Sequence, residues 1–197
     1  MDYQLDTASI KKSLDALAGR HERIARALAQ VGYPEERRRD HSFETLARIV
    51  VGQQVSVAAA TSINKKLVDA LEGQLTGTAV LDASEELLRS AGLSRQKVNY
   101  IQSLAAAEAT GALVLESLPE LSDEEAVAVI TNIKGFGEWS AHMYLMFSLG
   151  RPDIWPVGDL AVRDAPRDRG RDCELGRERR RRGRGGGRGG ARAARPF

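Results

Sequence analysis

Residues 130–141 of this chain read ITNIKGFGEWSA, and this stretch decides the fold that we expect. An apolar helical pattern ends at Asn132, two glycines follow with one residue between them, and a second amphipathic helix begins after Gly137. Glycine lets a backbone turn tightly and approach another backbone. The unpaired N–H groups and the positive dipole end of the second helix can hold a phosphate without a basic side chain. On this spacing alone, a plain helix–helix turn is the alternative interpretation.

The segments around this hairpin also carry helical patterns. Apolar spacing predicts a helical stretch from Thr7 to Val31 with a break near Gly19, and Ser122 to Glu125 forms a capping box before the hairpin. Serine residues that act as caps predict further helices. These run from Phe43 to about Gly52, Val57 to Leu71, Glu85 to Ala91 and Arg95 to about Thr110, with a short one at Ala79–Leu81. With no strand pattern and no internal repeat, the predicted fold class is all-α.

Composition and charge exclude several classes of protein. One cysteine among 197 residues excludes an intrachain disulfide, and it also excludes a zinc or iron–sulfur site ligated by several cysteines of this chain. No run of about 18 apolar residues exists, so we expect no membrane span.

The net charge of +2 is unevenly distributed: residues 164–197 hold 12 Arg and five acidic residues, which leaves residues 1–163 with a net charge of −5. The acidic start of the chain is not that of a secretory signal, and we expect a cytoplasmic, nucleoid-associated protein.

Four segments, in this order, resemble the helix-hairpin-helix DNA glycosylase superfamily, and within it the DNA-3-methyladenine glycosylase II branch. They are residues 43–56 (FETLARIVVGQQVS), 88–97 (LRSAGLSRQK), the hairpin at 133–137 and 150–163 (GRPDIWPVGDLAVR). The resemblance implies two helical lobes around a cleft. It also implies that residues 1–40 form N-terminal helices that pack with the C-terminal lobe, and that residues 41–163 form the glycosylase core.

The resemblance places Asp159 at the position of the catalytic carboxylate. A carboxylate can stabilise the oxocarbenium-like transition state of base excision and can orient or deprotonate water. The alternative is a helix N-cap, since Gly158-Asp159 opens a helical pattern, and both roles are compatible. Asp153 is a rival carboxylate, but beside Pro152 it is better interpreted as a turn residue.

Aromatic side chains near the hairpin are candidates for the pocket of an extruded base. The predicted substrate-binding residues are Trp139, Met143, Tyr144 and Trp155. An electron-rich indole suits a cationic alkylated purine, whereas core packing is the alternative. In the branch of the superfamily that cleaves the strand, a lysine occupies the position of Trp139. An indole cannot form a Schiff base, so the resemblance implies a monofunctional enzyme.

The predicted DNA contacts lie in two loops. Gln54 matches the wedge residue that fills the gap left by an extruded base, although a polar helix end at Gln53-Gln54 is equally compatible. The hairpin contributes the other predicted contacts, Lys134, Gly135, Gly137 and Ser140. Four further basic residues are interpreted as solvated faces with phosphate contact as a second option: Lys65, Lys66, Arg95 and Lys97.

The helical pattern breaks after Arg163. Residues 164–197 contain 12 Arg and 8 Gly, with Leu175 and Phe197 as the only large apolar residues, so we expect a disordered tail. Three interpretations compete: an Arg/Gly-rich arm that binds nucleic acid, a functionless end, and a shift of reading frame near codon 164. We favour the frameshift, because the break falls inside a helix that the resemblance requires. The last helices of the family fold would then be missing and activity would be impaired.

The predicted function is hydrolysis of the N-glycosidic bond of alkylated purines, of the 3-methyladenine type, in duplex DNA. The expected partner is double-stranded DNA that contains alkylated bases. We expect the protein to be a monomer and to have no membrane as a partner. We expect no metal and no cofactor, apart from a monovalent cation at the hairpin carbonyls that the resemblance suggests. The alternatives are a glycosylase for another damaged or mismatched base and a non-catalytic DNA-binding protein.

Overall fold

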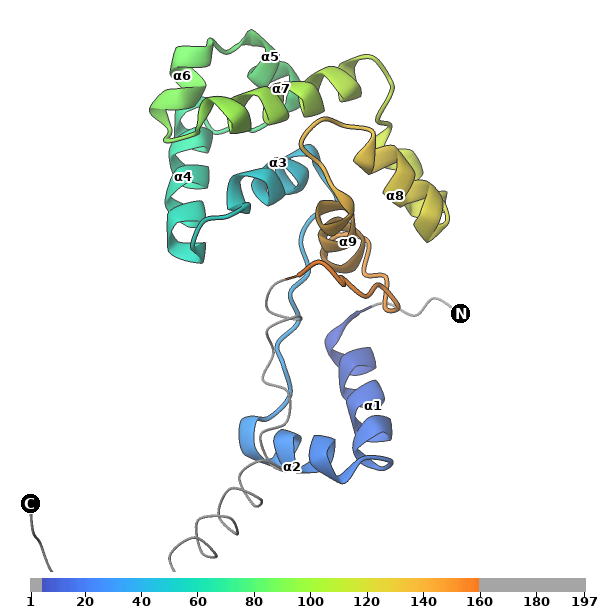
Figure 1. Cartoon of the computed structure of the whole chain (residues 1–197). Coiled ribbons are helices and arrows are strands. Elements are labelled where there is room, and N and C mark those ends of the chain that lie inside the picture. The colour runs from blue at the N-terminus through green and yellow to red at the C-terminus, as the bar shows by residue number, and fades with distance from the viewer. Residues whose placement is uncertain (1–4, 160–197) are drawn as a thin grey trace, which may run out of the picture. The chain divides into compact units, whose positions relative to one another are not determined.

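A computed structural model describes residues 5–159, and every regular element in this range is a helix (Figure 1). The helices are α1 (Thr7–Ala18), α2 (Glu22–Val31), α3 (Phe43–Gly52), α4 (Val57–Ala70), α5 (Gly77–Asp82), α6 (Glu85–Ser90), α7 (Arg95–Ala109), the 3-10 helix η1 (Leu115–Glu120), α8 (Asp123–Thr131) and α9 (Glu138–Phe147). The all-α prediction is therefore confirmed for the described residues. The chain divides into two units after Gly158, and the helices pack within the first of these units. The predicted tail at 164–197 lies outside the described residues.

Serine caps explain where most of these helices begin. The hydroxyls of Ser42, Ser56, Ser84, Ser94 and Ser122 each accept a hydrogen bond from the backbone N–H three residues ahead. The predicted capping box is present in full, because the Glu125 side chain also accepts from the Ser122 N–H at 2.9 Å. The helix starts predicted from these serines are therefore confirmed, and the helix ends lie within about one residue of the predicted ones. The short predicted helix at Ala79–Leu81 is longer than predicted, because α5 begins at Gly77 with Thr76 as its cap.

Two helix boundaries near the N-terminus lie at glycines, and one short helix further along the chain was not predicted. The predicted break at Gly19 separates α1 from α2, and α2 ends at Gly32, whose φ of 75° lies in the left-handed region. Between α7 and α8 the sequence pattern predicted no helix, yet η1 forms there with Pro119 inside it. A 3-10 helix of six residues is too short to show an apolar period, so periodicity alone does not reveal it.

The core gathers around α3, which packs against α4, α7 and α9. Four of its side chains are completely buried: Leu46, Ala47, Val50 and Val51. Helices α8 and α9 pack against each other, and Figure 1 shows the hairpin that joins them. α3 therefore carries, at its C-terminal end, a loop that the fold holds beside the start of α9.

The charged connector between α2 and α3 is fastened to other segments by its backbone and by one carboxylate. The Arg39 N–H donates to the Phe147 carbonyl at 2.7 Å, and the Asp40 carbonyl accepts from Thr45 Oγ1 at 2.8 Å. Glu36 accepts from both the N–H and the hydroxyl of Thr7. The connector, residues 35–40, is therefore exposed along most of its length but is bonded to neighbouring segments.

Candidate functional site

The hairpin between α8 and α9 is a tight turn that requires glycine at one position. Gly135 has φ +95°, and a Cβ placed there would overlap the Tyr100 ring from α7. Phe136 is buried, and its N–H donates to the Ile133 carbonyl at 3.0 Å. The turn is therefore anchored in the core through Phe136, and Gly135 packs against the Tyr100 ring.

The start of α9 lacks a side-chain cap. Its N-cap is Gly137, an exposed residue with φ −94° that needs no glycine for its conformation and has open space where a Cβ would lie. Among the helices described between residues 5 and 159, α9 thus differs from those with a Ser, Thr or Asp cap. First-turn N–H groups without a side-chain acceptor are suited to bind an anion. The exposed Lys134 precedes this position and adds positive charge.

The second predicted DNA loop lies directly beside the hairpin. Gln53 Nε2 donates to the Gly135 carbonyl at 3.0 Å and to Ser140 Oγ at 3.2 Å. Gln54, the next residue, is exposed and has φ +56°. The Ser140 side chain is buried in this contact, so it supports the loop instead of reaching solvent. The structure therefore brings four predicted site residues together: Gln54, Gly135, Gly137 and Ser140.

Lys97 corrects one interpretation from the sequence. The side chain is half-buried and donates from Nζ to the carbonyls of Val51 at 2.7 Å and Gln53 at 2.9 Å. Burial lowers the pKa of this ammonium. The predicted solvated face is therefore wrong for Lys97, whereas it holds for Arg95, which is exposed and paired with Glu85.

The predicted base-contacting residues fall in three environments. Trp139 and Met143 are half-buried, one helical turn apart on α9. Tyr144 is completely buried, and its hydroxyl donates to His41 Nδ1 at 2.8 Å while His41 Nε2 donates to the Leu115 carbonyl at 2.7 Å. A side chain in this position stabilises the core and has no surface to offer a base. Trp155 lies in the loop after α9 and is 68% exposed.

Asp159 is the last described residue and the first one after the division of the chain. Its side chain is partly exposed, and the helix that it was predicted to open lies outside the described residues. The loop that leads to Asp159 is held at its beginning by Arg151. The Arg151 guanidinium donates hydrogen bonds to Asp123 and to three backbone carbonyls between residues 118 and 121. The assignment of Asp159 as catalytic carboxylate stays a prediction.

No cluster of three or more metal-ligating side chains occurs within residues 5–159. The hairpin carbonyls suggested for a monovalent cation are already engaged: those of Ile133, Gly135 and Gly137 each accept one hydrogen bond. Each oxygen therefore keeps one lone pair for another partner. The cation at the hairpin stays a prediction. In the described part of the chain, no helix has the length and apolar character needed to cross a membrane.

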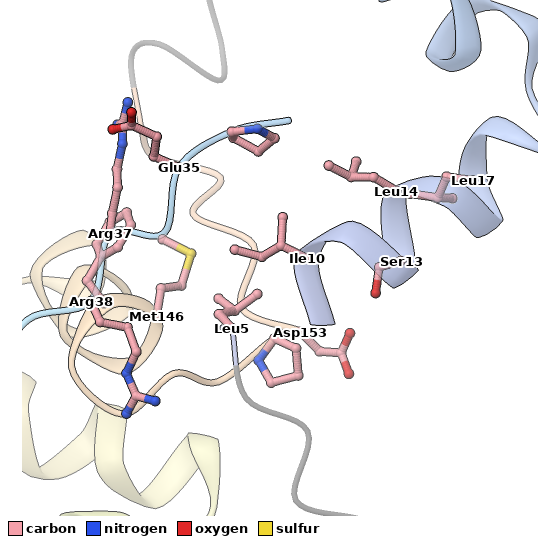
Figure 2. A pocket seen from close by; sticks show the side chains of 13 residues that line it. Leu5, Ile10, Ser13, Leu14, Leu17, Glu35, Arg37, Arg38, Met146 and Asp153 are labelled. Carbon is pink, nitrogen blue, oxygen red and sulfur yellow. The ribbon is translucent and has the colours of Figure 1, made fainter. Parts of the chain in front are cut away.

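A cavity of about 890 Å³ lies away from the hairpin. Leu5, Ile10 and Met146 face it from three segments (Figure 2), and the connector at 34–38 closes one side. Asp153 lines it, but none of the residues predicted for catalysis, base binding or DNA contact does. The cavity is therefore not the site that the sequence indicates.

Comparisons with known proteins agree with the hairpin geometry. Residues 47–169 match the model of the HhH-GPD superfamily base excision DNA repair proteins, which covers most of the core and the hairpin. The chain belongs to the HhH-GPD superfamily. The match ends close to the position where the composition of the chain changes.

Individual relatives in this superfamily are moderately similar. DNA-3-methyladenine glycosylase 1 of Schizosaccharomyces pombe is 33% identical over 165 residues, which cover 81% of this chain and 72% of that protein. DNA-3-methyladenine glycosylase of Saccharomyces cerevisiae is 33% identical over 61% of this chain and 44% of its own length. The solved structure of the S. pombe 3-methyladenine DNA glycosylase in complex with abasic DNA has a TM-score of 0.71 at 34% identity and covers 77% of each chain.

The sequence predicted the residues of the two loops better than the residues that hold these loops in place. Tyr100 and His41 were not singled out, and Lys97 was interpreted as solvated, because each acts through a partner more than 30 positions away in the chain. Periodicity reports which face of a helix is buried, but not which backbone carbonyl a lysine reaches. One signal was available for Tyr100: a glycine in a tight turn often marks the close approach of another group.

Proposed function

We propose that this chain is a monofunctional DNA glycosylase that hydrolyses the N-glycosidic bond of alkylated purines in duplex DNA. The observation that carries the proposal is the junction of the two loops, in which Gln53 bonds the Gly135 carbonyl and places the Gln54 loop beside the uncapped start of α9. Loops that must fill a gap in the duplex and grip its phosphates have to act on the same few base pairs. Relatives named DNA-3-methyladenine glycosylases support the class of substrate.

The proposed division of labour follows from side-chain chemistry. N–H groups at the start of α9 bind a phosphate, and Gln54 takes the place of the extruded nucleotide. Trp139 and Met143 contact the base, and the indole favours a purine that carries positive charge through alkylation. Asp159 stabilises positive charge on the sugar and orients the attacking water. Without a lysine in place of Trp139, the strand stays intact after base release.

Base release from dimethyl-sulfate-treated duplex DNA tests the proposal. The full chain and Asp153→Asn are expected to release 3-methyladenine, whereas Asp159→Asn should release it at least about a hundredfold more slowly and still bind the DNA. Asp153 is the matched control, since it is an exposed carboxylate of the same loop. Equal release by Asp159→Asn would contradict the assignment of that residue. A folded chain that binds methylated DNA without releasing any base would instead be a non-catalytic binding protein.

A further inference from the structure

One face of α7 contacts both loops of the proposed DNA-binding site. Lys97 and Tyr100 are three positions apart in this helix and therefore lie on the same side of it. Lys97 reaches the end of α3, and Tyr100 lies under Gly135 of the hairpin. α7 packs along α3, as Figure 1 also shows. A single rigid element thus contacts two loops that are about 80 positions apart in the chain.

The ammonium of Lys97 binds where α3 needs a donor. The last carbonyls of a helix have no partner within it and carry partial negative charge. Val51 lies in the last turn of α3 and Gln53 is its C-cap, and Lys97 Nζ donates to both of their carbonyls. The half-buried position of the side chain keeps water from replacing these bonds freely. Lys97 therefore fixes the direction in which the chain leaves α3.

The residue that follows this fixed point has a strained backbone. Gln54 has φ +56°, which a non-glycine residue keeps only when its surroundings impose it. On its N-terminal side, Lys97 holds the Gln53 carbonyl while the Gln53 side chain is bonded to Gly135 and Ser140. Gln53 is thus held at both its backbone and its side chain, and the exposed Gln54 projects from it.

We propose that Lys97 is a positioning residue, which holds the Gln53–Val55 loop in the conformation that presents Gln54 to DNA beside the hairpin. It does not touch the base or the sugar. The inference rests on the proposed function, in which Gln54 and the start of α9 act on the same duplex. Lys97 would then act on the step that extrudes the base rather than on the initial capture of DNA.

Hydrogen exchange of the free protein tests this inference without DNA. Lys97→Met keeps the length and the helix propensity of the side chain but removes the ammonium, so α7 is expected to form as before. Exchange of the backbone amides at residues 51–56 should be at least about tenfold faster in Lys97→Met. Lys65→Met, which removes an exposed lysine on α4, should leave this segment unchanged. Unchanged exchange at residues 51–56 in Lys97→Met would overturn the inference.

Kinetics on methylated duplex DNA separate positioning from charge. We expect Lys97→Met to lower kcat by about tenfold with little change in KM, because the loop acts after binding. Loss of a phosphate contact would instead raise KM and leave kcat intact, as for a general loss of positive charge. A KM effect equal to that of Lys65→Met, with an unchanged kcat, would also overturn the inference. If the wild type excises no base, the proposed function fails, and the exchange experiment still decides the role of Lys97 in the loop.

Discussion

At the scale of single residues, the two glycines of the hairpin have different tasks. Gly135 combines a left-handed φ with a contact in which the Tyr100 ring occupies the space of a Cβ. Gly137 has an extended conformation that alanine also adopts, and its Cβ would meet nothing. Its value lies in leaving the start of α9 accessible. Gly135 is therefore required by the turn itself, whereas Gly137 matters for DNA binding only under the proposed function.

We expect Gly135→Ala to destabilise the protein by more than about 2 kcal/mol, since it adds a left-handed alanine and an overlap with Tyr100. Gly137→Ala should cost no more than about 1 kcal/mol, the usual difference between these two residues as N-caps. Urea unfolding followed by circular dichroism measures both values. Equal losses for the two variants would mean that Tyr100 does not support the turn.

At the scale of elements, Arg151 joins the segment after α9 to the start of α8. Its guanidinium bonds Asp123 and donates to the carbonyls of Leu118 at 3.1 Å and Pro119 at 3.3 Å, as well as to that of Leu121. The Arg151 side chain is only 16% exposed, and the carbonyls of Leu118 and Leu121 are part-buried, whereas Asp123 is 43% exposed. The two part-buried carbonyls would therefore lose their donor where water has limited access. This clamp lies just before the loop that leads to Asp159.

Replacement of Arg151 by Met should lower the free energy of unfolding by about 1–3 kcal/mol, because it leaves two part-buried carbonyls without their donor, whereas water can solvate the exposed Asp123 carboxylate. Arg95→Met is the matched control: its ion pair with Glu85 is exposed, and its loss should cost less than about 1 kcal/mol. Both values follow from chemical denaturation. Arg151→Met with the stability of Arg95→Met would show that the clamp contributes no more than a surface ion pair.

The helices and the hairpin were predictable because their signals are local. Ser122 and Glu125 of the capping box lie within one helical turn of each other. Gly135 has the positive φ that the hairpin requires, and a glycine at such a position is visible in the sequence itself. Lys97 was wrongly interpreted as solvated, and core packing of Tyr144 was only the alternative interpretation, because their partners come from distant segments. A lysine on a helix surface is solvated or buried depending on what packs beside it, and periodicity does not contain that information.

At the scale of the whole molecule, stability is distributed unevenly over the described residues. α1 and α2 have no buried side chain, whereas α3 has six buried residues. The N-terminal segment is joined to the rest by a few bonds, such as Leu5 N–H to the Gly150 carbonyl at 3.0 Å and Thr7 to Glu36. Local opening is cheapest where few apolar contacts are lost.

Amide hydrogen exchange should therefore be much faster in α1 and α2 than in α3 and α7. We expect a difference of at least about a hundredfold, since the N-terminal pair can open without exposing core surface. Mass spectrometry of peptic fragments of the full chain measures it under native conditions. Equal protection of α2 and α3 would show that the N-terminal pair unfolds only together with the core.

The central claim is that this HhH-GPD chain excises alkylated purines, and the release of 3-methyladenine by the full-length protein tests it most directly. The measurement compares methylated duplex DNA incubated with the protein and the same DNA incubated in buffer, which corrects for spontaneous depurination. Circular dichroism establishes that the protein is helical in the assay. The account predicts release well above the buffer control, with no strand cleavage. Release at the spontaneous rate by a helical protein that binds this DNA would contradict it.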